Sequence, residues 1–206
     1  MSQSLANWLE PASIQHARYT PGELERISGL GADMQRVWRR RGQLPTKGSG
    51  HARFTIAEVV EITLRVALSR AGVPPGEPLP ELTTAASGAM HHAIFCHGAV
   101  EVIGPAAEVE DFLHIFREDN GDLGRFLIGN PQASHFLVLN DRREIRVVDE
   151  PADIVGADEE LNLVFNLVLL GARLVERGRK PVALVQFPDQ PGERTIRRLT
   201  GLLKNL

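Results

Sequence analysis

The chain has 206 residues, 43% of them hydrophobic, which is enough for one sizeable core or two small ones. Its single cysteine, Cys96, excludes an intramolecular disulfide and is typical of a reducing cytoplasm, which is the compartment we expect. The first residues lack the basic region and apolar run of a signal peptide, and no uncharged stretch reaches membrane-spanning length, so we expect no membrane partner.

Charge is distributed unevenly along the chain, although the net charge is only −3. Residues 16–72 contain ten Lys and Arg residues against five Asp and Glu residues, whereas residues 73–206 contain 13 against 20. A basic segment joined to an acidic remainder indicates a polyanionic partner for the first part of the chain.

The segment 74–80, which follows Gly72 and Val73, is rich in proline, and such a run cannot continue a helix. We expect a domain boundary there. The chain then divides into an N-terminal tail over 1–17, a first domain over 18–73, a proline-rich linker over 74–80 and a second domain over 81–206.

Three short helices are predicted before the linker by the spacing of apolar residues. They begin after Thr20, at Ala32 and after Thr55, and glycines follow the first two. Both threonines are expected to cap their helices, and Glu58 has the spacing of a capping box with Thr55. The polar, glycine-rich stretch 43–54 leaves room for a tight hairpin between the second and third helices.

After the linker, helices and strands alternate. We expect helices over 81–97, 105–116, 158–177 and 195–206, and strands over 99–103, 134–139, 144–148 and 182–187. The helix over 158–177 is apolar on more than one face, so it is either a central core helix or part of a dimer interface.

Two short helices joined by a glycine turn are the parts of a helix-turn-helix, whose second helix enters the major groove of DNA. The second helix here presents Arg36, Arg39 and Arg40 on one face, while Met34, Val37 and Trp38 turn partly toward the core. Arginine can pair with guanine or clamp phosphates, and Gln35 can read adenine.

The loop after this helix has the composition of a β wing. Glycines allow a tight turn, Lys47 and Arg53 supply cations beside His51, and Phe54 anchors the base of the loop. The fold class is therefore α+β: a winged helix-turn-helix, mainly α with a small β wing, followed by a mixed α+β domain.

Three stretches carry a resemblance to a known family: Tyr19-Thr20-Pro21-Gly22-Glu23-Leu24, Arg36-Val37-Trp38-Arg39-Arg40-Arg41-Gly42-Gln43-Leu44-Pro45 and Arg53-Phe54-Thr55. Residues 18–72 resemble the DNA-binding domain of the MerR family of transcription regulators. The resemblance implies that Arg36 contacts the groove or a phosphate, that Trp38 touches the DNA backbone and that Arg53 is the wing cation. It also implies a dimer on a two-fold-related operator.

The candidate DNA-binding residues are Tyr19, Thr20, Gln35, Arg36, Trp38, Arg39, Arg40, Lys47, His51 and Arg53. We expect a dimeric, sequence-specific regulator of transcription that binds double-stranded DNA, and a repressor rather than an activator. Two alternatives stay open: an architectural or excisionase-like protein that bends DNA, and a protein-interaction module whose arginine face binds an acidic partner. Whether a small molecule binds the second domain is left open.

No catalytic residue is proposed, because the sequence lacks a phosphate-binding glycine loop, a dinucleotide fingerprint and a nucleophile elbow. His92 and Cys96 are four apart, which is metal-ligand spacing on a helix, and His114 or His135 would be further ligands. Without a paired cysteine motif we expect neither a metal nor a cofactor.

Overall fold

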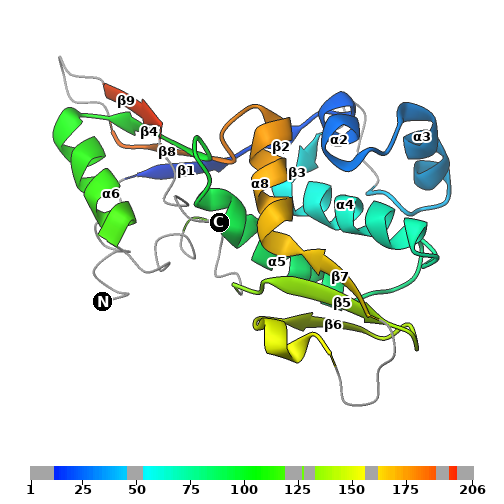
Figure 1. The fold of residues 1–206 in the computed structure, drawn as a ribbon. Coiled ribbons are helices and arrows are strands. Elements are labelled where there is room, and N and C mark those ends of the chain that lie inside the picture. The colour runs from blue at the N-terminus through cyan, green and yellow to red at the C-terminus, as the bar shows by residue number, and fades with distance from the viewer. Residues whose placement is uncertain are drawn as a thin grey trace.

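Figure 1 shows the computed structural model, which describes residues 12–45, 53–118, 127, 133–155, 162–188 and 195–198. The chain is a mixed α+β protein, as expected. Its helices are α2 (Pro21–Ser28), α3 (Ala32–Arg40), α4 (Ile56–Arg70), α5 (Glu81–Ile94), α6 (Ala106–Glu118), the short 3-10 turn η1 (Pro151–Asp153) and α8 (Leu167–Gly178). Its strands are β1 (Ser13–His16), β2 (Arg18–Tyr19), β3 (Phe54–Thr55), β4 (Val100–Gly104), β5 (Phe136–Asn140), β6 (Ile145–Val148), β7 (Asn162–Asn166), β8 (Ala183–Gln186) and β9 (Thr195–Arg198).

The starts of α2 and α4 lie side by side because the strands that precede them pair. Strand β2 runs antiparallel to β3, with Tyr19 opposite Phe54. Thr20 then forms a capping box with Glu23, and Thr55 forms one with Glu58, as expected from the spacing of Thr55 and Glu58. Each threonine side chain thus accepts a hydrogen bond from a backbone N–H that the helix itself leaves without a partner.

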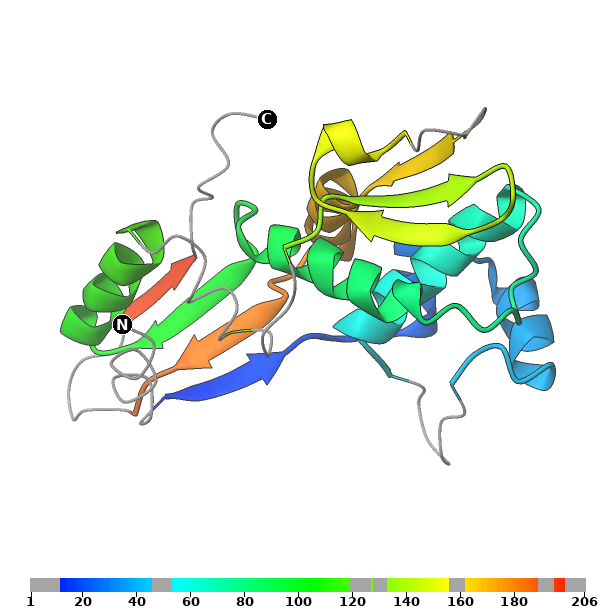
Figure 2. The same cartoon turned by 90° about the horizontal axis from the view of Figure 1, so that it is seen from below.

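The centre of the molecule is the crossing of α5 and α8 (Figure 2). A Cβ atom added at Gly171 would lie 2.6 Å from the carbonyl oxygen of Ala89 and 2.7 Å from the backbone nitrogen of Ala93. A side chain at this position would push the two helices apart, so glycine allows their close approach.

The expected single helix over 158–177 is wrong. Residues Asn162–Asn166 form strand β7, which pairs along its length with β5, and α8 begins only at Leu167. Asn166 caps α8, because its side-chain oxygen accepts a hydrogen bond from the backbone nitrogen of Leu169. The apolar run on both sides of Asn166 therefore divides between a sheet and a helix.

Two further sheets complete the fold (Figure 2). One is antiparallel with strand order β6-β5-β7, and β5 and β6 lie where strands were expected over 134–139 and 144–148. The other has the order β1-β8-β4-β9, with β8 parallel to β4, and α6 packs against β4 and β9. Strand β1 lies within residues 1–17, which were expected to form an N-terminal tail. Strand β9 lies where the sequence predicted a helix from Thr195, so the helix is wrong over Thr195–Arg198.

The N-terminal helices pack directly on the rest of the chain. Helix α4 lies along α5 and α2 contacts α8, so the proline-rich segment 74–80 joins two helices that touch. The Arg26 side chain donates to the carbonyl oxygens of Arg177 and Gly178, and the Arg177 side chain donates to that of Ile27. Among the described helices, none has the length and apolar character needed to span a membrane.

Candidate nucleic-acid interface

Helix α3 has two faces of opposite character. Gln35 and Trp38 are each 2% exposed and hold the helix against the core. Arg36, Arg39 and Arg40 are exposed on the other side. The helix contacts α2 across the turn from Gly29 to Gly31, in which Gly29 has a left-handed φ of 74°. The arrangement presents three cations to solvent on one short, firmly seated helix.

Gln35 fixes the helix in place, which corrects its expected role as a reader of adenine. Its side-chain Nε2 donates to the carbonyl oxygen of Pro21 at 2.9 Å and to that of Leu30 at 2.8 Å. These carbonyls belong to the first residue of α2 and to the turn, so one buried amide ties α3 to both. A buried side chain with its donors occupied cannot reach a base edge.

The arginine face is accessible and only weakly engaged within the chain. The Nη1 of Arg36 lies 2.8 Å from Oδ1 of Asp33, and the two side chains are 73% and 93% exposed. Exposed ion pairs of this kind stabilise a protein by about 1 kcal/mol or less, so Arg36 can exchange Asp33 for another anion. Asp33, Val37 and the three arginines line an open, shallow hollow on this face.

Tyr19 and Trp38, which were expected to contact DNA, cannot do so in this structure, because they are 0% and 2% exposed. Burial raises the pKa of the Tyr19 phenol, and the charge of Glu23 raises it further. The Thr20 hydroxyl accepts the capping hydrogen bond from the backbone nitrogen of Glu23. Met34, expected to turn toward the core, is instead 48% exposed.

The structure describes only some of the residues that were expected to form a wing. Arg53 is exposed and directly precedes strand β3. Lys47 and His51, with the expected hairpin tip, lie outside the described residues. The candidates that the structure places at the surface near α3 are therefore Arg36, Arg39 and Arg40, with Arg41, exposed at the end of the helix, as an addition.

The side chains of His92 and His135 pack against each other, and those of His92 and Cys96 bond to backbone carbonyls. The Nε2 of His92 donates to the carbonyl oxygen of Ser134 at 3.1 Å, and the ring of His135 lies 4.9 Å away, centroid to centroid. Cys96 donates its thiol hydrogen to the carbonyl oxygen of His92. Burial, together with His91 and His135, lowers the pKa of His92 to about 4, and burial raises that of Cys96. Within the described residues, no group of three or more His, Cys, Asp or Glu side chains is placed to hold a metal ion.

A second group of arginines, which the sequence pattern did not indicate, surrounds a pocket between α4 and α8. Arg70 comes from the end of α4, and Arg173 and Arg177 come from α8. About half the chain separates Arg70 from the two arginines of α8, so no local sequence motif joins them. Comparison of the chain with models of known protein families and with curated proteins finds no match.

Proposed function

We propose that this chain is a DNA-binding regulator of transcription that reads the major groove with α3. In this proposal α2, the turn and α3 act as a helix-turn-helix, and the segment between α3 and β3 acts as a wing. The observation that carries it is the division of α3 into a buried face, held by Gln35 and Trp38, and an exposed face of Arg36, Arg39 and Arg40.

Charge supports nucleic acid as the partner of this face. The segment that contains α3 has twice as many cationic as anionic residues, while the remainder of the chain is acidic. An acidic remainder repels DNA and leaves the arginine face as the favoured contact, which also orients the approach. The likeness of residues 18–72 to the MerR family adds to the same proposal.

We infer that the protein binds its operator as a homodimer. One short recognition helix reads a short half-site, and joining two on one operator raises the affinity. Among the described strands, β7 lies at an edge of its sheet, and Leu163 on it is 40% exposed, which suits pairing with β7 of a second copy. Sedimentation equilibrium of the full chain should show a dimer that Leu163→Lys dissociates and Ile196→Lys, on β9, does not.

The experiment that tests the function is selection of bound sequences from random duplex DNA by the purified chain. A two-fold-related motif is the expected result, and a repressor is the regulator we favour. Enrichment of flexible sequences without base preference would support the excisionase-like alternative. If any polyanion competes equally well with the selected DNA for the protein, the acidic-protein alternative is supported. Either of these two results would contradict the proposal.

A further inference from the structure

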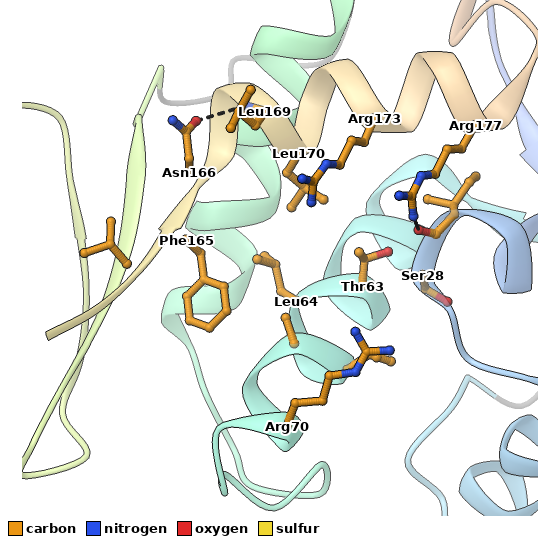
Figure 3. A pocket seen from close by; sticks show the side chains of 14 residues that line it. Ser28, Thr63, Leu64, Arg70, Phe165, Asn166, Leu169, Leu170, Arg173 and Arg177 are labelled. Carbon is orange, nitrogen blue, oxygen red and sulfur yellow. Dashed lines mark hydrogen bonds between the residues drawn. The ribbon is translucent and has the colours of Figure 1, made fainter.

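A pocket of about 350 Å³ lies at the junction between the N-terminal helices and the α8 side of the molecule (Figure 3). Its first wall is formed by the end of α2 and by one face of α4. Its second wall is formed by the end of β7 and by α8. The volume is within the range of sites that bind small molecules.

The lining combines an apolar floor with cations. Leu64, Phe165 and Leu170 supply apolar surface, while Arg70 and Arg173 reach into the space between the walls from opposite sides (Figure 3). Neither of these two arginines makes a hydrogen bond or ion pair with a residue that the structure describes, and none of the lining residues is acidic. Arg177 adds a third cation at the α2 end, where it donates to the carbonyl oxygen of Ile27.

We propose that this pocket binds a small organic anion: a carboxylate on a compact apolar body. The carboxylate is held between Arg70 and Arg173, because guanidinium groups pair with carboxylates through two parallel hydrogen bonds. The apolar body lies on Leu64, Phe165 and Leu170, from which it displaces water. Two unpaired cations facing each other above apolar side chains favour such a ligand over a neutral or cationic one.

Occupancy of the pocket also acts on the turn before α3. The Nη2 of Arg70 lies 3.2 Å from the position that a Cβ atom would take at Gly29, so this guanidinium rests on the turn that joins α2 to α3. A carboxylate that draws Arg70 toward α8 changes the contact that supports α3. The anion therefore regulates DNA affinity, and this regulatory step rests on the proposed function.

The first test measures ligand binding without DNA. Calorimetry of the full chain compares octanoate with octylammonium, which has the same number of carbon atoms and the opposite charge. Octanoate should bind at least about tenfold more tightly, and Arg70→Gln and Arg173→Gln should each weaken it by about tenfold. Arg117→Gln, which changes an exposed arginine of α6, is the matched control. Equal binding of both probes, absence of binding, or unchanged affinity in both variants would overturn the proposal.

A second test measures DNA affinity with and without saturating octanoate. We expect a change of at least about fivefold in the wild type and none in Arg173→Gln. If octanoate leaves the DNA affinity of the wild type unchanged, the regulatory step is overturned. Whether the pocket binds the anion is then decided by the calorimetry alone. If DNA competes directly with octanoate for Arg70 and Arg173, these arginines bind phosphates of DNA, and the proposed carboxylate site would be overturned. Octanoate binding in a chain that binds no DNA would overturn the proposed function instead.

Discussion

The Nζ of Lys180 lies 2.8 Å from Oε1 of Glu23 and joins the segment after α8 to the first turn of α2. The same ammonium donates to the carbonyl oxygen of Arg18 at 2.7 Å and lies 4.4 Å from the centroid of the Tyr19 ring. Glu23 also accepts a hydrogen bond from the backbone nitrogen of Thr20. One pair of side chains thus fastens the start of the N-terminal helices to the C-terminal part of the fold.

Lys180→Met should lower the free energy of unfolding by about 1–3 kcal/mol at neutral pH, the range for a lost charge-assisted hydrogen bond. Burial raises the pKa of Glu23, but hydrogen bonds from Lys180 and Thr20 outweigh it and leave this pKa below its usual value of 4.5. Because the folded-state pKa is lowered, the stabilisation is present above that value and is lost as the pH falls below it.

Urea unfolding of the wild type and Lys180→Met from pH 7 to pH 3 measures this contribution. The difference between the two should shrink toward pH 3. Glu176→Gln, at an exposed position of α8, should match the wild type throughout. A difference that stays constant with pH would show that packing of the lysine stem, and not its charge, stabilises the junction.

Gln35→Leu should destabilise the fold by about 2–4 kcal/mol, because it leaves two backbone carbonyls without their donors inside the protein. The neighbouring Met34→Ala, at an exposed position, should change stability by about 0.5 kcal/mol or less. Denaturant titration compares the two variants. If Gln35→Leu kept full stability and lost only DNA affinity, Gln35 would instead contact a base in the major groove.

Tyr19→Phe should leave the free energy of unfolding unchanged or raise it. The hydroxyl is buried and makes no hydrogen bond with the residues that the structure describes, so its removal also removes a desolvated polar group. DNA affinity should be unchanged, since the ring is 0% exposed. Tyr19→Ala, which empties the site, should by contrast cost about 3–5 kcal/mol in thermal or chemical unfolding. A drop in DNA affinity for folded Tyr19→Phe would refute the buried placement.

The fold should lose stability in acid through His92. Its pKa is lowered to about 4 in the folded chain, against 6.5 when exposed, so the unfolded chain binds the extra proton as the pH falls through this window. Between pH 7 and pH 4.5 the wild type should lose roughly 2 kcal/mol more than His92→Gln. Parallel pH profiles for the two proteins would show that His92 is charged in the folded state.

Local chemistry made the N-terminal helices predictable. Thr55 and Glu58 have the spacing of a capping box, which favours a helix start, and Gly29 marks a left-handed stop. The apolar run around Asn166 is compatible with strand or helix, and pairing with β5, which no local pattern encodes, decided between them. Strands β1 and β9 depend on partners far along the chain in the same way.

The candidate interface was predictable in part for a related reason. Arg36, Arg39 and Arg40 are exposed because nothing inside a core satisfies an unpaired guanidinium. Gln35 follows no such rule, since its amide can face water or bind backbone carbonyls. Here the first residue of α2, Pro21, and the turn residue Leu30 supply those carbonyls. The pocket between Arg70 and Arg173 depends on the packing of α4 and α8 against α5, which helical periodicity does not reveal.

Titration of a selected DNA site by fluorescence anisotropy tests whether the exposed face of α3 contacts DNA, as proposed. Arg36→Ala and Arg39→Ala should each weaken binding by about 1–3 kcal/mol, while Arg117→Ala on the distant α6 should bind as the wild type does. Circular dichroism and unfolding midpoints confirm that the variants are folded. Wild-type affinity in both Arg36→Ala and Arg39→Ala would show that this face does not contact DNA.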